Sequence, residues 1–199
     1  MNTRISALYV LSLAAAFSLL TLSNLAIGEG TAPAKACEEC HGADGVSIKE
    51  NVPTIAGISS FVNADYLYAF RDGARTCIDP EFTEKCSVKN DLTDDQIEGL
   101  AEYFAGMEFK PAAQEFDADK AALGAGIHAE NCDKCHTDGG ANPDDDSSIL
   151  SGQWTGYLHA ALLQFAKDER EQPTSMKRKM EALSEADIEA LAHYYASQQ

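Results

Sequence analysis

The stretch Cys132-Asp-Lys-Cys-His136 determines the fold expected for this chain of 199 residues, because its pattern occurs a second time as Cys37-Glu-Glu-Cys-His41. Cys-x-x-Cys-His is the signature of covalent haem attachment. The two thiols add to the vinyl groups of a haem, and the adjacent histidine is placed to ligate its iron. One copy alone is also compatible with a redox dithiol or half of a zinc site. Two copies predict two covalent haem c groups, with attachment at Cys37, Cys40, Cys132 and Cys135 and iron ligation by His41 and His136.

The two motifs belong to two copies of one sequence repeat. A shift of 95 residues places Cys37 on Cys132 and continues without a gap. The same shift aligns Gly57 with Gly152, Phe70 with Phe165, and Arg75 with Arg170. Farther along the shift is 91 residues, aligning Leu92 with Leu183, Leu100 with Leu191, and Phe104 with Tyr195. The first repeat therefore carries four extra residues between Arg75 and Leu92, and the two remaining cysteines, Cys77 and Cys86, lie in that interval.

Each repeat has the hydrophobic spacing of helices and no strand-like alternation. Segments 66–71 and 157–167 are predicted as the second helix of each repeat. The last helix of each repeat is predicted to start at a capping box, Thr93 with Gln96 and Ser184 with Asp187. Its buried face is then Ile97, Leu100 and Phe104 in the first repeat, and Ile188, Leu191 and Tyr195 in the second. The predicted class is all-α, with two tandem class I cytochrome c domains, each wrapped around one covalent haem c.

The amino terminus has the pattern of a secretory signal peptide. Arg4 precedes the apolar run 5–20, and small and polar residues follow it. Cleavage after Gly28 is favoured over cleavage after Ala34, and an uncleaved anchor is the alternative. The predicted organisation is a signal peptide at 1–28, a first domain at 29–106, a linker at 107–120 and a second domain at 121–199. The mature chain is then periplasmic, without stable membrane insertion.

The composition is acidic and indicates which partners to expect. The chain has 32 Asp and Glu against 15 Lys and Arg, a net charge of −17. This charge argues against binding to nucleic acid or anionic lipid and favours basic partners, although exported proteins are often acidic for solubility alone. The sequence contains no Ser/His/Asp or paired-carboxylate constellation and no Gly-rich phosphate loop, so we expect no catalysis by the chain alone.

A methionine in the second repeat is the candidate sixth ligand of its iron. Met176 lies seven residues before Leu183, on the segment leading into the last helix. Methionine ligation raises the reduction potential of a haem. Met180 is the competing candidate, but one helical turn farther on it is expected to pack in the core.

The equivalent position in the first repeat is Lys85, seven residues before Leu92. Three alternatives stay open there: coordination by Lys85 as a neutral amine, an open or water-bound iron, or another side chain. The reference pKa of lysine is about 10.4, so the iron would have to displace a proton. Cys77 or Cys86 could ligate only if reduced, and an oxidising compartment favours a disulfide between them. Unequal ligands predict a higher potential at the second haem and electron transfer from the first domain to the second.

The sequence also indicates positions or partners for several other residues. Arg75 and Arg170 recur in register and are expected either to pair with haem propionates or to form surface salt bridges. Trp154, the only tryptophan, is expected to pack against a haem or the domain interface. The histidines outside the motifs are expected at the surface or at a haem edge; they are His128, His159 and His193.

The whole mature sequence resembles the dihaem class I cytochromes of the c-four group, and still more closely the cytochrome subunit of flavocytochrome c sulfide dehydrogenase. The likeness rests on the second motif with Gly139 and Gly140, on Ile-Leu-Ser-Gly-Gln-Trp-Thr-Gly-Tyr-Leu at 149–158, on Lys-Pro-Ala-Ala-Gln-Glu-Phe at 110–116 and on Tyr-Tyr-Ala-Ser-Gln-Gln at 194–199. The resemblance implies the haem-binding residues given above, with Met176 on the second iron.

The same resemblance implies a partner and leaves alternatives. It implies docking on a flavoprotein that oxidises sulfide, and transfer of the electrons to a soluble cytochrome or other acceptor. Lys85 departs from the family pattern, which has methionine there, and this puts the ligation of the first iron in doubt. The alternatives are a free-standing dihaem carrier to a terminal oxidase, and a haem protein that binds a small molecule at an open first iron.

Overall fold

The computed structural model describes residues 31–78 and 91–199, and all regular structure within them is helical. The elements are α1 (Thr31–His41), η1 (Ala43–Gly45), α2 (Ser60–Arg71), α4 (Asp94–Ala105), α5 (Ala118–Asn131), η4 (Asp138–Gly140), α6 (Thr155–Ala166), α7 (Thr174–Met180) and α8 (Glu185–Ala196). The predicted all-α class is confirmed. The predicted signal peptide at 1–28, Lys85 and Cys86 lie outside the described residues.

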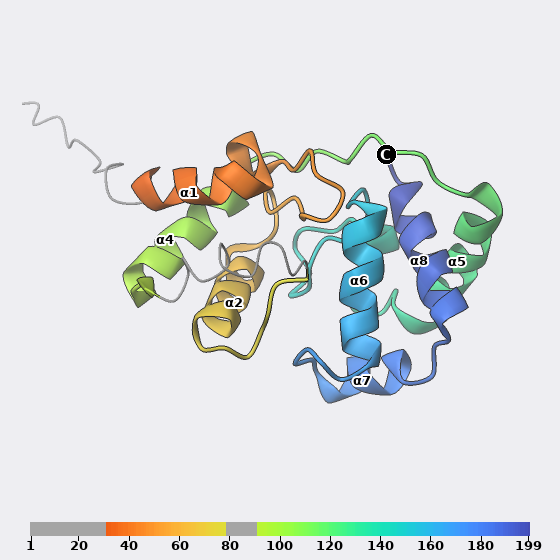
Figure 1. Cartoon of the computed structure of the whole chain (residues 1–199). Helices are drawn as coiled ribbons and strands as arrows, with labels where there is room; N and C mark the ends of the chain where they lie inside the picture. Colours follow the sequence, from red (N-terminus) through yellow and green to blue (C-terminus); the bar gives the residue numbers. More distant parts are fainter. Residues whose placement is uncertain (1–30, 79–90) are drawn as a thin grey trace, which may run out of the picture.

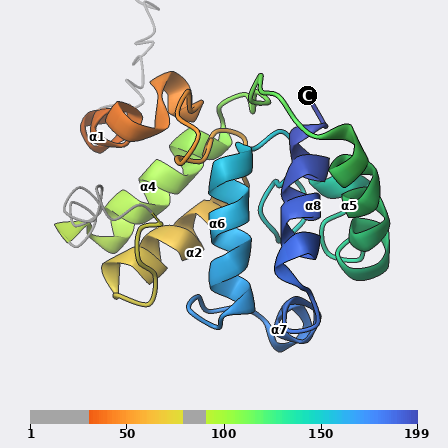
Figure 2. The same cartoon turned by 45° about the vertical axis from the view of Figure 1, so that its right-hand side comes forward.

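The chain forms two halves with the same order of helices (Figure 1). Helices α1, α2 and α4 make the first half, and α5, α6 and α8 are their counterparts in the second. In the turned view, α6 stands between α2 of the first half and α8 of its own half (Figure 2). No helix in the described part of the chain is both long and apolar enough to cross a membrane.

Both predicted capping boxes form, and they start the last helix of each half. The hydroxyl of Thr93 accepts a hydrogen bond from the Gln96 amide at 3.3 Å, and the Gln96 side chain accepts one from the Thr93 amide at 3.0 Å. Ser184 and Asp187 make the same reciprocal pair at 3.2 and 2.8 Å. Each box satisfies two amides that a helix start leaves without an intrahelical partner. The residues of the two predicted apolar faces are buried: Ile97, Leu100, Phe104, Ile188, Leu191 and Tyr195.

The second helices start earlier than predicted. α2 begins at Ser60, six residues before the predicted start, because the Ser59 hydroxyl caps it by accepting from the Val62 amide at 3.3 Å. α6 begins at Thr155, two residues early, without a side-chain cap. The short helix α7 was not predicted at all; it carries both candidate methionines of the second half.

The second half is held together by a close crossing of α5 and α8. Gly124 of α5 meets the backbone of α8, and a Cβ atom at this position would lie 2.1 Å from the carbonyl oxygen of Ala190. The missing side chain therefore lets the two helix backbones approach each other. Beside this crossing lies the main core cluster, which includes Leu158, Leu162 and Tyr195.

The segment between α4 and α5 is an ordered strap across the second half. The Ala112 amide donates to the Gly152 carbonyl at 2.7 Å, and the Gln114 side chain donates to the Gln153 carbonyl at 2.8 Å while accepting from the Thr155 amide at 2.9 Å. Gly152 has a φ of 72°, and a Cβ there would lie 2.7 Å from Pro111. α5 begins at Ala118, within the predicted linker 107–120.

The two halves are joined by hydrogen bonds from the second half to the backbone of the first. The side chain of Gln153, which is 1% exposed, accepts from the Thr54 amide at 2.9 Å and donates to the Thr54 carbonyl at 2.7 Å. The Trp154 indole donates to the Ser47 carbonyl at 2.9 Å, which agrees with the predicted place of this residue at the domain interface. The backbone positions contacted in this way are Ser47, Glu50 and Thr54.

Candidate haem-binding sites

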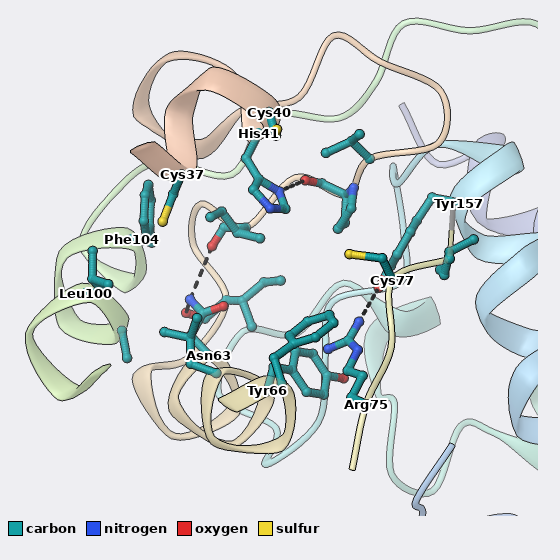
Figure 3. A pocket seen from close by; sticks show the side chains of 18 of the residues that line it. Cys37, Cys40, His41, Asn63, Tyr66, Arg75, Cys77, Leu100, Phe104 and Tyr157 are labelled. Carbon is teal, nitrogen blue, oxygen red and sulfur yellow. Dashed lines mark hydrogen bonds between the residues drawn. The ribbon is translucent and has the colours of Figure 1, made fainter. Parts of the chain in front are cut away.

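The first half contains a largely apolar cavity of about 330 Å³ beside its Cys-x-x-Cys-His motif. Cys37, Cys40 and His41 reach it from the end of α1 (Figure 3). The apolar lining includes Leu67, Leu100 and Phe104, and the second half contributes Ser148, Gln153 and Tyr157. A cavity of this size with few convergent polar groups is typical of a cofactor site. The four motif cysteines, all within the described residues, form no disulfide and so keep the thiols that haem attachment requires.

The imidazole of His41 is held in the tautomer that iron ligation requires. Its Nδ1 lies 2.8 Å from the carbonyl oxygen of Pro53. A carbonyl oxygen can only accept, so Nδ1 carries the proton and Nε2 keeps its lone pair for a metal. A backbone contact 12 residues along the chain therefore sets both the orientation and the protonation of the predicted ligand.

The second half repeats this arrangement. Nδ1 of His136 lies 3.2 Å from the carbonyl oxygen of Ser148, the residue equivalent to Pro53. Burial lowers the pKa of His136 below 6.5 and favours the neutral imidazole, the form that binds metals. The local backbone differs, since α1 contains the whole first motif whereas α5 ends at Asn131 and the second motif follows it in turns.

Both candidate axial methionines lie on α7, and one of them is in the core as predicted. Met180 is 4% exposed and belongs to the core, whereas Met176 is half-buried and packs against the same core, which Cys132 also contacts. In the first half, Cys77 lines the cavity and is disulfide-bonded. Its predicted partner Cys86 and the predicted ligand Lys85 lie outside the described residues, so both assignments stay predictions.

Two buried arginines test whether a haem fits here. Arg75 lines the first cavity and is 8% exposed, and its counterpart Arg170 is 5% exposed. Within residues 31–78 and 91–199, neither arginine forms an ion pair with a carboxylate. Nη2 of Arg170 is buried and has no hydrogen-bond partner in that part of the chain. The predicted alternative of surface salt bridges is therefore wrong, because both side chains are buried. A buried cation needs an anion beside it to be stable. A haem carries two carboxylates, so the two arginines fit a bound haem.

The two arginines also act on a tyrosine of the second half. Tyr157 is 8% exposed and its hydroxyl accepts from Nη2 of Arg75 at 3.3 Å. Burial by itself raises the pKa of this hydroxyl, but the charges of Arg75 and Arg170 outweigh burial and lower it. The sequence did not predict a role for Tyr157, Gln153 or Thr54. The recurrence of Arg75 and Arg170 was the one signal that pointed to this part of the structure.

One histidine outside the motifs is part of a buried polar network beside the second motif. Nδ1 of His128 lies 2.9 Å from the hydroxyl of Tyr195, which also hydrogen-bonds to Cys132. Nε2 of His128 lies 3.5 Å from Oδ1 of Asp133. His128 is 2% exposed, which rules out the predicted surface position. In the first half the corresponding residues are Pro33 and Phe104, so this network distinguishes the second site.

Because His128 is buried, the protein is expected to lose stability on mild acidification. Burial lowers the pKa of His128 below 6.5, and Asp133 only partly opposes the shift. The unfolded chain then takes up a proton near pH 6.5 before the folded chain does, so the free energy of unfolding decreases as pH falls through and below that value. In denaturant titrations between pH 7.5 and 5, the variant His128→Gln should lose less stability than the parent. Equal pH dependence of the two proteins would contradict this assignment.

Comparison with known proteins finds relatives that are similar over most of the chain. A family model described as cytochrome c oxidase, cbb3-type, subunit III matches residues 119–194, which form most of the second half. Cytochrome c4 of Pseudomonas aeruginosa is 28% identical over 175 residues, covering 83% of this chain and 85% of that protein. The thiosulfate dehydrogenase electron acceptor of Stutzerimonas stutzeri is 28% identical over 177 residues, covering 85% of this chain and 82% of that protein.

Solved structures agree with these sequence matches. The crystal structure of reduced recombinant cytochrome c4 from Pseudomonas stutzeri has a TM-score of 0.72 at 25% identity and covers 85% of this chain and 97% of that chain. Thiosulfate dehydrogenase from Marichromatium purpuratum has a TM-score of 0.68 at 25% identity over 82% of this chain and 36% of that one. The arrangement of two tandem helical domains is thus similar to that of cytochrome c4 along nearly its whole length.

Proposed function

We propose that this chain, a c4-like dihaem class I cytochrome c with two covalent haem c groups, carries electrons from a dehydrogenase that oxidises an inorganic sulfur compound to a soluble acceptor. The observation that carries the proposal is the pair of Cys-x-x-Cys-His sites in adjoining halves, each with its imidazole fixed by a backbone carbonyl.

Each half of the chain supplies the residues that would hold one haem. Cys37 and Cys40 would bind the first haem through thioethers, with His41 on its iron. In the second site the corresponding set is Cys132, Cys135 and His136, with Met176 as sixth ligand. When bound, each haem supplies an iron that takes up and releases one electron. Because axial ligands tune haem potentials over roughly 0.8 V, a methionine at the second site makes it the higher-potential centre and the exit for electrons.

Thiosulfate and sulfide dehydrogenases are the two candidate donors. A relative similar over 85% of this chain is described as a thiosulfate dehydrogenase electron acceptor, and this favours a donor that oxidises thiosulfate. The resemblance of the second domain to the cytochrome subunit of flavocytochrome c supports a flavoprotein that oxidises sulfide. The predicted signal peptide supports work in the periplasm, where such donors could reach the protein.

Rapid mixing distinguishes these donors. The oxidised full-length holoprotein is mixed with thiosulfate dehydrogenase and thiosulfate, or with a flavoprotein sulfide dehydrogenase and sulfide, while haem absorbance is followed. We expect enzyme-dependent reduction of both haems, faster with the thiosulfate enzyme. Faster reduction by the flavoprotein would reassign the donor, and no reduction by either would overturn the proposal. Binding of carbon monoxide to one reduced haem would instead favour a small-molecule function at an open first iron.

Replacement of Met176 tests the second site directly. Met176→Ala should lower the potential of one haem and change its spectrum, because the sulfur ligand is lost while the core remains. Met180→Ala is the matched control from the same helix. It should cost about 2–5 kcal/mol of stability, as expected for a buried methionine, while both spectra remain unchanged. If Met180→Ala changed the haem spectrum and Met176→Ala did not, the two roles would be reversed.

A further inference from the structure

One peptide group of the first half is hydrogen-bonded on both sides. It joins Pro53 to Thr54, so it consists of the Pro53 carbonyl and the Thr54 amide. Its oxygen accepts from Nδ1 of His41 at 2.8 Å (Figure 3). Its N–H donates to Oε1 of Gln153 at 2.9 Å. A chain of two hydrogen bonds therefore leads from a side chain of the second half to the predicted iron ligand of the first half.

The side chain of Gln153 is fixed in the orientation that this chain requires. Gln153 and Thr54 are each 1% exposed. Nε2 of Gln153 donates to the Thr54 carbonyl oxygen at 2.7 Å, so both ends of the side-chain amide bind the same residue. A flipped amide would place its NH₂ group against the Thr54 N–H and its oxygen against the Thr54 carbonyl. Oε1 of Gln153 is therefore the atom that faces the peptide group of His41.

The equivalent residues at the second site do not reproduce this chain of bonds. The shift of 95 residues places Thr54 on Ile149, and it places Gln153 on Ile58. The side chain of Ile58 can neither donate nor accept a hydrogen bond. It therefore cannot polarise the peptide group that faces His136, and the effect of Gln153 is confined to the first site.

We infer that Gln153 is a positioning residue for the first haem, which strengthens the hydrogen bond from His41 to Pro53 and thereby lowers the reduction potential of that haem. Hydrogen bonds in series polarise one another, so donation by the peptide N–H makes the peptide oxygen a stronger acceptor. A stronger acceptor at Nδ1 makes the imidazole a more basic ligand. A more basic ligand stabilises the ferric iron, so contact with the second half lowers the potential of the first haem.

Redox titration of holoprotein carrying Gln153→Met tests this role. Methionine has a similar length but no donor and only a weak acceptor. Loss of a direct partner of a metal-bound histidine typically has an effect of about tenfold or more. Gln153 lies one group farther from the iron, so we expect a roughly threefold shift toward the reduced form, about 28 mV for one electron. The shift should occur at the first haem only.

Gln153→Glu tests the same bond without removing the acceptor. A glutamate oxygen can still accept from the Thr54 N–H, and it is a stronger acceptor when ionised. The first haem should therefore keep the potential of the parent or have a lower one. A higher potential in this variant would contradict the inference, whether or not the methionine variant folds.

The Nδ1 proton of His41 provides a measurement on the ligand itself. In the reduced, ¹⁵N-labelled holoprotein its NMR signal should move upfield in Gln153→Met, because its bond to Pro53 weakens. A changed potential with an unchanged His41 signal would overturn the inference, since Gln153 would then act on the haem directly. An unchanged potential of the first haem would overturn it as well.

Trp154→Phe is the matched control. The bond from Trp154 to the Ser47 carbonyl also crosses between the halves, at 2.9 Å, but it does not lead to His41. Both potentials should therefore stay unchanged in this variant. Equal shifts in the Trp154 and Gln153 variants would mean that a loosened interface is the cause, and this would overturn the inference. All these measurements are independent of the electron donor, so failure here is distinguishable from failure of the proposed function.

Discussion

Replacement of both Cys37 and Cys40 by serine is expected to give a protein that carries one haem instead of two. The serine hydroxyl does not form the thioether to a haem vinyl group, and without it His41 alone would have to retain the cofactor. The second half should keep its haem, because its motif and Met176 do not depend on these thiols. Mass spectrometry of the denatured protein should show the loss of one haem, and the haem content per chain should halve.

The reciprocal variant is the matched control for this experiment. Replacement of Cys132 and Cys135 by serine should also leave one haem, but with the spectrum of the first site. The two single-haem proteins should then differ in potential, and the protein that retains the first haem should have the lower value. Two haems in either variant would contradict the attachment sites. The absence of both haems would show that the halves cannot load independently.

A loss of stability without any change to the haem sites is expected for Gly124→Ala. The added methyl group would lie 2.1 Å from the Ala190 carbonyl oxygen and 2.7 Å from Cβ of Tyr194. The nearest atoms are backbone, so α5 and α8 would have to separate. Overpacking of this kind costs about 1–3 kcal/mol and sometimes more, and the helix propensity of alanine, worth about 1 kcal/mol, offsets only part. We expect a net loss of about 2 kcal/mol in thermal or denaturant unfolding.

Gly126 in the same helix provides the control. It is exposed, and a Cβ there meets no atom within 4 Å. Gly126→Ala should therefore raise the stability by up to about 1 kcal/mol through helix propensity alone. A stabilising Gly124→Ala would mean that α5 and α8 lie farther apart than the structure places them.

The parts of the fold that the sequence predicted correctly are those governed by local chemistry. The two capping boxes locate the starts of α4 and α8, because the bonds of each box join residues three apart. The start of α2 was missed because it depends on Ser59, and because at this end of the helix the apolar Phe61 is exposed while the polar Asn63 is buried. α7 was missed because seven residues are too few for a periodic signal.

The haem-binding residues were predictable only where they belong to a sequence motif or to a repeated spacing. The two Cys-x-x-Cys-His stretches and the seven-residue offset of Met176 are visible in the sequence. The Gln153 pairing with Thr54 spans 99 residues, and no local pattern indicates which residues meet across an interface. The recurrence of Arg75 and Arg170 left propionate pairing and surface salt bridges open, and only their burial excludes the second.

The joint between the halves also affects how the protein can evolve. The second half forms hydrogen bonds with backbone carbonyl and amide groups of Ser47, Glu50 and Thr54. Nearly every amino acid supplies these backbone groups. Ile48, with 83% of its surface exposed, lies within this segment and faces solvent. Substitutions at this position can therefore accumulate without loosening the assembly. Related cytochromes could in this way acquire different recognition surfaces close to the first haem while the distance between the two irons stays constant.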